Sequence, residues 1–268
     1  MQSPYVPARA EPAHLSPGPA EPRPVSSLGA IKFVFEDQDW KYNVLIGMVL
    51  VLIPIIGPLA LSGWLMEVHQ RLVRRHPHPV PKLEFGDFVF LLQRGVTPFL
   101  VSLVTMLPLI LIVYGMMVGI GFGAFFVYGA TDEPLLAAGA GLVGTLFLMV
   151  FWCLFAIVMN AAMTRAELLE DFGRTLRFGE LMAYARRTAG MVVVKTFSFG
   201  FLSFGVVLLG LLACYIGIYP AIVVLQIASM HLRWQVYEDY VAKGGAPLEL
   251  KPPQWLPSEA ERARAYGP

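Results

Sequence analysis

The stretch from Val96 to Gly129 decides the fold, and it reads VTPFLVSLVTMLPLILIVYGMMVGIGFGAFFVYG. It contains no Lys, Arg, Asp, Glu or His. As an α-helix it would be about 50 Å long, whereas the hydrocarbon core of a bilayer is about 30 Å thick. Two complete spans would need roughly 40 residues plus a turn. The stretch therefore predicts one long, tilted membrane helix that bends at Pro108 and projects outward.

A second uncharged stretch, Leu135 to Met163, follows directly. The residues between the two, Thr131-Asp-Glu-Pro134, have the composition of a turn. We therefore expect the two stretches to form a helical hairpin.

Glycines mark the expected contact between the arms of this hairpin. Residues 139–144, GAGLVG, match the letters of a dinucleotide-binding fingerprint, but that fingerprint requires a preceding strand. Inside apolar helices, small residues at four-residue spacing instead allow two backbones to approach closely. We expect Gly119 to meet Gly141 in the outer half of the hairpin. The predicted helix-packing residues are Gly115, Gly119, Gly123, Gly141 and Gly144.

Two further apolar stretches are interrupted. Residues 196–230 contain a turn-forming cluster from Cys214 to Pro220, so we expect two short spans there. Residues 43–68 contain Pro54 and Pro58, which must break or kink a helix. This segment is either one kinked span or a re-entrant hairpin, and the second interpretation is favoured because Lys32 and Lys41 oppose an equally basic elbow. The side of the membrane on which the N-terminus lies stays open.

Composition agrees with a membrane protein, since 56% of the 268 residues are hydrophobic and 15% are charged. A net charge of +1 excludes the broad basic field of a nucleic-acid-binding protein. The organisation expected is a disordered Pro-rich tail over residues 1–29, a helical membrane domain over residues 30–243, and a disordered tail over residues 244–268.

Basic residues gather in two elbows, 67–93 and 164–195, whereas the turn at 130–134 has none. The positive-inside rule therefore places both elbows and the C-terminal segment in the cytoplasm. The elbows suit amphipathic helices at the membrane interface.

The elbows also suggest an internal repeat. Phe-Gly-acid is followed by Arg at the same spacing in both elbows, before an apolar helix. A second correspondence joins Pro58, His69 and Arg71 to Pro220, His231 and Arg233. The elbow residues of the repeat are Phe85, Gly86, Asp87 and Arg94, with Phe178, Gly179, Glu180 and Arg187.

The sequence offers no set of residues for catalysis, for a cofactor or for a metal ion. The uncharged stretches lack the ionisable group that ion-coupled transporters usually carry near the midplane. Pairs of His and Arg at two helix ends could instead hold lipid phosphates, or extend to the interface as ordinary basic side chains do. The candidate lipid-headgroup residues are His69, Arg71, His231 and Arg233.

Several short motifs, in this order, resemble one known family. They are Phe35–Trp40 (FEDQDW), Leu52–Pro58 (LIPIIGP), the Phe85-Gly86-Asp87 elbow and Cys214–Pro220 (CYIGIYP). The chain resembles the prokaryotic membrane family called domain of unknown function 4013, from about Leu28 to Val241. The resemblance implies a multi-pass protein of a prokaryotic cytoplasmic membrane, and it implies no activity and no site residues.

Two functions fit these observations. The first is a non-enzymatic scaffold that interacts with membrane lipids and with a membrane-protein partner or further copies of itself. The second is a permease or channel for an apolar or amphipathic solute, which the repeat and the proline-interrupted segments favour.

Overall fold

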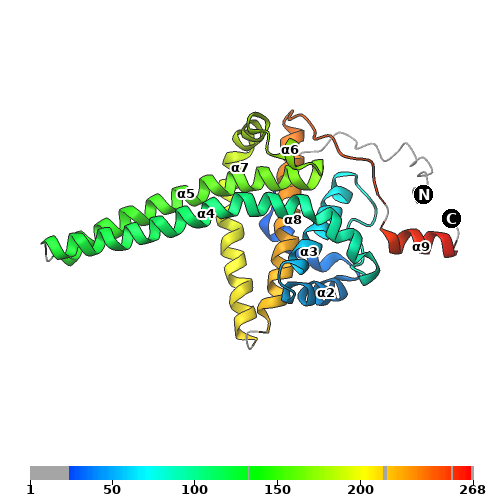
Figure 1. Ribbon diagram of the computed structural model, residues 1–268, viewed down its shortest axis with the longest axis horizontal. Helices are drawn as coiled ribbons and strands as arrows, with labels where there is room; N and C mark the ends of the chain where they lie inside the picture. Colours follow the sequence, from blue (N-terminus) through cyan, green and yellow to red (C-terminus); the bar gives the residue numbers. More distant parts are fainter. Residues whose placement is uncertain (1–23, 132, 214–215, 255, 267–268) are drawn as a thin grey trace.

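The computed structural model describes residues 24–131, 133–213, 216–254 and 256–266. Within these ranges the chain forms helices and no strand, which confirms the expected all-α bundle. A compact head carries two helical hairpins that project from it in different directions (Figure 1). Three helices, α4, α5 and α7, are long and apolar enough to cross a membrane.

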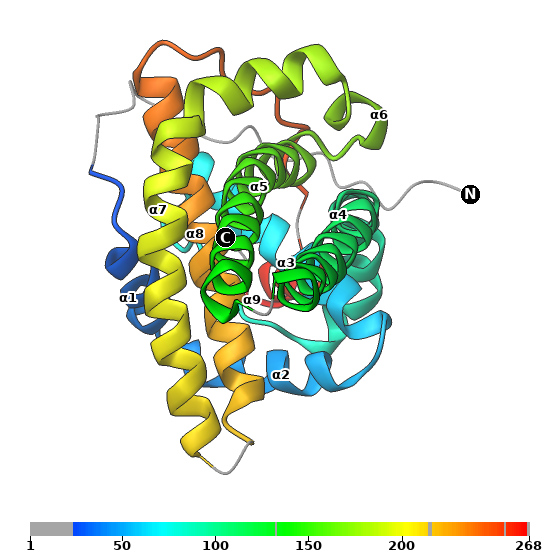
Figure 2. The ribbon, with the colours of Figure 1, turned by 90° about the vertical axis from the view of Figure 1, so that its left-hand side faces the viewer.

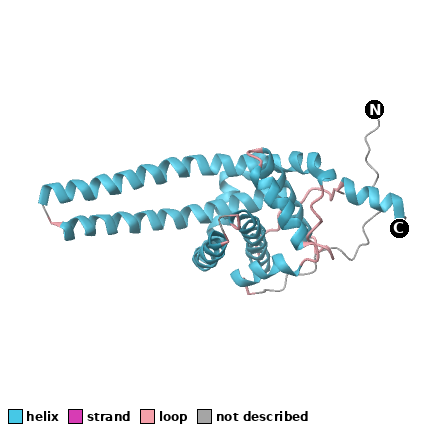
Figure 3. Ribbon diagram, turned by 90° about the horizontal axis from the view of Figure 1, so that it is seen from below, coloured by secondary structure: helices cyan, strands magenta, loops and turns pink. Residues whose placement is uncertain are grey.

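The longer hairpin consists of α4 (Phe88–Thr131) and α5 (Pro134–Leu169). Helix α4 follows the short 3₁₀ helix η2 (Phe85–Asp87) and runs unbroken through two prolines, which confirms the expected single long helix. Beyond Leu109, no described residue of α4 is buried, because the outer half of the hairpin contacts only its own partner arm. Figure 3 shows this half extending away from the rest of the protein. Asp132 of the expected turn lies outside the described residues.

The second hairpin consists of α7 (Phe178–Leu212) and α8 (Ile218–Ala242), which confirms the expected division of residues 196–230 into two helices. Of these two, α7 alone is among the described helices that are long and apolar enough to cross a membrane, so the second span stays a prediction. Gly210 and Gly217 face each other across the turn. A Cβ atom on Gly210 would lie 2.7 Å from the carbonyl oxygen of Gly217, so only glycine fits there. Cys214 and Tyr215 of the expected turn lie outside the described residues.

Residues 43–68 are divided between α2 (Trp40–Leu52) and α3 (Ile56–Val73). Between them, Ile55 has φ 65° and ψ −58°, and the Ile56 amide donates to the Pro54 carbonyl at 2.7 Å. This is a γ-turn of the rare form, which is strained for a β-branched residue. The side chain of Ile55 is 69% exposed. The predicted break is therefore present, and the choice between a kinked span and a re-entrant hairpin stays a prediction.

Helix α3 lies at the centre of the head, between α4, α5 and α8 (Figure 2). It is buried on all sides from Leu61 to Val73 except at Ser62. Trp64 is fully buried and donates its indole N–H to the Pro81 carbonyl at 3.0 Å. Because the core surrounds this one helix, its polar residues must find partners inside the protein.

The remaining helices are short. Helix α1 (Ser27–Glu36) begins where Ser26 accepts a hydrogen bond from the Gly29 amide at 3.0 Å. Helix α6 (Phe172–Thr175) lies between α5 and α7. The second basic elbow forms no separate interfacial helix, because α7 continues without a break from the elbow into the apolar stretch. This differs from the expected amphipathic helix at the interface.

The prediction of a disordered tail after residue 243 is wrong for its described residues. They cross the surface as an irregular segment, bury Leu256 at 1% exposure and end in α9 (Pro257–Tyr266). Polar contacts order this segment, and composition alone could not reveal them. For example, Arg74 donates to the Lys251 carbonyl at 2.6 Å, and the Tyr237 hydroxyl accepts from the Leu248 amide at 2.9 Å.

Candidate functional site

The last two turns of α3 carry four polar residues inside the head. Glu67, His69, Gln70 and Arg71 are each no more than 6% exposed. A buried charge is costly unless it is paired and hydrogen-bonded. Their partners come from α4, α5 and α9, and Arg233 of α8 joins the group through Glu167 of α5. Five helices are therefore tied together.

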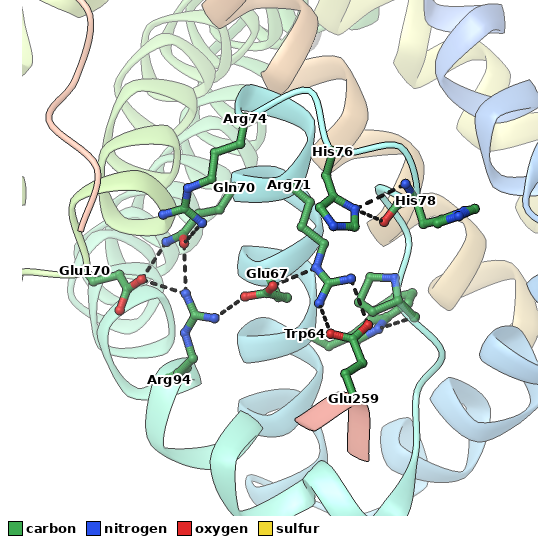
Figure 4. Close-up of polar contacts among 11 residues, drawn as sticks. Trp64, Glu67, Gln70, Arg71, Arg74, His76, His78, Arg94, Glu170 and Glu259 are labelled. Carbon is green, nitrogen blue, oxygen red and sulfur yellow. Dashed lines mark hydrogen bonds and ion pairs between the residues drawn. The ribbon is translucent and has the colours of Figure 1, made fainter. Parts of the chain in front are cut away.

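One line of ion pairs runs from α9 to the base of the long hairpin (Figure 4). Glu259 pairs bidentately with Arg71, at 3.0 and 2.6 Å, and Arg71 donates its Nε–H to Glu67 at 2.7 Å. The other oxygen of Glu67 accepts from Arg94 of α4, which also pairs with Glu170 at 2.6 Å. Carboxylates and guanidinium groups therefore alternate along the whole line.

Gln70 links Arg94 to the end of α5. Its amide NH₂ donates to the Glu167 carbonyl at 2.9 Å and to Glu170 at 2.6 Å. Its amide oxygen accepts from Arg94 at 2.9 Å and from Arg74 at 3.2 Å. Glu170 caps α5 with φ 51°, a left-handed conformation that turns its side chain toward the group.

A second centre surrounds Glu167, which is 1% exposed. His69 Nδ1 lies 2.6 Å from one carboxylate oxygen, and Arg233 of α8 donates to the other at 2.6 Å. Because an ionised carboxylate only accepts hydrogen bonds, Nδ1 of His69 carries a proton here. Glu167 therefore joins α3, α5 and α8 through a single side chain.

Together these residues form what we call the head network: Glu67, His69, Gln70, Arg71, Arg94, Glu167, Glu170, Arg233 and Glu259. Four carboxylates face three guanidinium groups and one imidazole, so the charges nearly balance. Such an arrangement is typical of structural ion networks, in which each charge is held in place by its neighbours.

A comparison with known protein families identifies the family of this chain. The family model described as protein of unknown function (DUF4013) matches residues 46–216. The chain belongs to this family. No curated protein and no solved structure matches it. The DUF4013 match includes most of the head network and the whole long hairpin, and it ends before α8 and α9.

The predicted headgroup residues of this DUF4013 protein lie inside it, so that prediction is wrong. His69, Arg71 and Arg233 are bound to carboxylates of the head network. His231 is 9% exposed and stacks on Phe33, with ring centroids 4.0 Å apart. The sequence placed these residues at helix ends. However, the carboxylate that binds both His69 and Arg233 belongs to Glu167 of α5, which is far from both in the sequence.

His231 has no acidic partner among the described residues. Burial lowers its pKa to about 4, with a further contribution from nearby His69. The imidazole is therefore neutral at pH 7, and its Nδ1 lies 3.0 Å from the side-chain amide of Gln235.

The glycines predicted to pack the long hairpin differ in their surroundings. A Cβ atom on Gly144 would lie 2.5 Å from Ile120, so this glycine does lie at the contact. The predicted meeting of Gly119 and Gly141 does not occur, since a Cβ atom on either would meet nothing within 4 Å. The same holds for Gly115 and Gly123. The reason is rotation of α4, which presents Ile120 rather than the glycine row to its partner.

The two elbows of the predicted repeat have similar places at the starts of long helices, but different surroundings. Asp87 and Arg94 are buried, whereas Arg187 is exposed and the Glu180 side chain is 54% exposed. Glu180 pairs with Arg165 at 2.6 Å. The remaining elbow residues, Phe85, Gly86, Phe178 and Gly179, are exposed. Duplication therefore stays a prediction.

Among the residues that the structure describes, no group of three His, Cys, Asp or Glu side chains lies close enough to hold a metal ion. The sequence prediction that the protein has no catalytic, cofactor or metal site stays a prediction.

Proposed function

We propose that the protein is a non-enzymatic membrane scaffold that binds anionic lipid at its cytoplasmic face. The proposal rests first on the head network, whose charged groups are used to fix five helices relative to one another. A rigid head on a long apolar hairpin suits a scaffold, because the hairpin anchors the protein and the head keeps its surface in a fixed position relative to the membrane.

The observation that carries the lipid part is the exposed face of α7. Arg186 and Arg187 are exposed, and within the described part of the chain they have no acidic partner. On the same helix, Phe197, Phe201 and Phe204 are 51%, 80% and 68% exposed. These rings lie about 15 to 25 Å along the helix from Arg187 at 1.5 Å per residue. Guanidinium groups at headgroup level with rings at acyl-chain depth fit this spacing.

Extraction into polymer nanodiscs, followed by lipid mass spectrometry, tests the proposal. We expect anionic lipid to be enriched around the wild-type protein, and the enrichment to disappear in an R186Q/R187Q variant. Arg177→Gln is the matched control, because Arg177 is exposed on the same elbow but paired with Glu180. Equal lipid composition in wild type and variant would contradict the proposal. Solute flux through proteoliposomes would favour the permease instead.

A further inference from the structure

Helix α9 is held to the head by the residues at its beginning. The Ser258 amide and hydroxyl donate to the two carboxylate oxygens of Asp87, at 2.8 and 2.6 Å. Asp87 itself is fully buried in η2. The next residue, Glu259, makes the bidentate pair with Arg71. At the start of α9, the head therefore binds two hydrogen-bond donors of one residue, Ser258, and the carboxylate of the next residue, Glu259.

Beyond this start, the last described side chains of α9 are polar and face outward. Glu261 and Arg262 are exposed, and Arg262 reaches Glu84 only at 3.4 Å. Between α8 and α9, the described residues 243–254 and 256 contain no helix. The described part of this connection crosses the surface as far as Leu256, which is buried directly before α9. Separation of α9 from the head therefore unfolds no other helix, but it starts from this anchored residue.

A cavity of about 500 Å³ lies beside Glu259. We call this cavity, together with the surface of the head that holds the start of α9, the groove. Helix α9 therefore fills only part of the groove. The volume of the cavity is within the range of cavities that bind ligands. Its lining includes Arg71, Glu259 and Arg262. It also includes Glu36 at the end of α1, and Asp37 and Asp39 from the loop between α1 and α2. The cavity thus continues from a site for a carboxylate toward acidic groups that suit basic side chains.

We propose that this groove is a docking site for a protein partner, and that α9 occupies it in the partner's absence. The partner contributes a helix that begins with a hydroxyl residue and an acidic residue, and that carries basic side chains beyond them. Its acid pairs with Arg71, its first turn bonds to Asp87, and its basic side chains enter the cavity toward Glu36 and Asp39. A tethered α9 competes at the high effective concentration that a short connection provides. This inference does not depend on the lipid-binding proposal.

The probe for this site is a fluorescent synthetic peptide of residues 254–268, QWLPSEAERARAYGP. It is titrated into the full-length protein, with binding followed by fluorescence anisotropy. An S258A/E259Q protein, in which the protein's own α9 is weakened, should bind the peptide at least tenfold more tightly than the wild type does. This variant should still fold, because Arg71 keeps its pair with Glu67.

Three controls make the result specific. E261Q protein removes an exposed charge from α9 and should bind the peptide as weakly as the wild type. A peptide carrying Glu259→Gln should not bind the S258A/E259Q protein. Adding R71Q to that protein should abolish binding of the original peptide. Equal binding of the peptide by the wild-type and S258A/E259Q proteins would overturn the proposal. Equal binding of the original peptide and the peptide with Glu259→Gln would also overturn it.

Hydrogen exchange of the wild-type protein gives an independent test. Because α9 must leave the groove for a partner to enter, its amides should exchange at least tenfold faster than those of α3. Exchange of α9 that is as slow as that of α3 would show a permanently packed helix and would also overturn the proposal.

Discussion

Arg94 of α4 and Glu170 at the end of α5 form an ion pair of 2.6 Å where the two arms of the long hairpin leave the head. Arg94 is 8% exposed and bonds to Glu67 and Gln70 as well. The angle at which the hairpin leaves the head is therefore fixed by a buried guanidinium group. Close packing of α4 on α3 acts at the same place, since Leu91 is buried and a Cβ atom on Gly95 would lie 1.9 Å from the Leu59 carbonyl oxygen.

Replacing Arg94 by Gln should destabilise the protein strongly. The change removes the ion-pair partner of Glu170 and one of the two guanidinium partners of Glu67, and breaking a buried pair typically costs about 3–5 kcal/mol. Thermal or denaturant unfolding in detergent measures it. Arg177→Gln, at an exposed ion pair, should change the unfolding free energy by no more than about 1 kcal/mol. Similar effects of the two changes would contradict a structural role for the head network.

Glu167 and Arg233 should behave as a coupled pair. E167Q and R233Q each break the 2.6 Å pair and should each destabilise the protein by about 3–5 kcal/mol. The double variant leaves no unpaired charge at this contact, so its loss should be smaller than the sum of the two single losses by at least 1 kcal/mol. A double-mutant cycle of unfolding free energies checks this, and strictly additive losses would show that the pair contributes nothing.

His231 should make the protein less stable in mild acid. Its folded-state pKa of about 4 lies below the ordinary value of 6.5, so the unfolded state binds the proton more readily. Stability is then fully present above about pH 6.5 and falls as the pH decreases toward 4. Between pH 7.5 and pH 5.0 the loss from this residue should be about 2 kcal/mol.

Unfolding at the two pH values, in wild type and H231Q, measures this contribution. The variant should lose about 2 kcal/mol less than the wild type on acidification. His78→Gln, at an exposed histidine, is the control and should leave the pH dependence unchanged. An H231Q protein with wild-type pH dependence would contradict a neutral, buried His231.

The contact inside the long hairpin can be tested with two glycines. G144L places a large side chain against Ile120 and should cost about 1–3 kcal/mol. G119L extends into open space and should leave stability within about 0.5 kcal/mol of the wild type. Unfolding measurements on both variants compare the two faces of α4. A larger loss of unfolding free energy for G119L than for G144L would support the glycine contact expected from the sequence.

The sequence was sufficient for the parts of the fold that depend on composition and local pattern. Uncharged stretches predicted α4, α5 and the α7–α8 hairpin, and Pro54 and Pro58 predicted the break between α2 and α3. The rotation of α4 about its axis was not predictable, because both Ile120 and the glycine row are compatible with an apolar helix. Side-chain packing against α5 decides between them.

The head network could not be predicted for a different reason. His69 and Arg233 were singled out, but as groups that face lipid, because an isolated basic residue at a helix end usually extends to the interface. Their common partner, Glu167, lies at the end of α5 and carries no local signal. The elbows 67–93 and 164–195 together hold seven acidic residues beside ten basic ones. These acidic residues were the one available indication that basic residues have partners inside the protein.

The line of ion pairs from Glu259 to Arg94 also has a consequence for how the protein is made. Glu67, Arg71, Arg94 and Glu170 are all synthesised well before Glu259 leaves the ribosome. Until then Arg71 has one carboxylate partner instead of two, and Asp87 has no Ser258 to bond. Maturation of the head therefore waits for the C-terminal segment, and a nascent chain interrupted before Ser258 would present an open groove to the quality-control machinery of the cell.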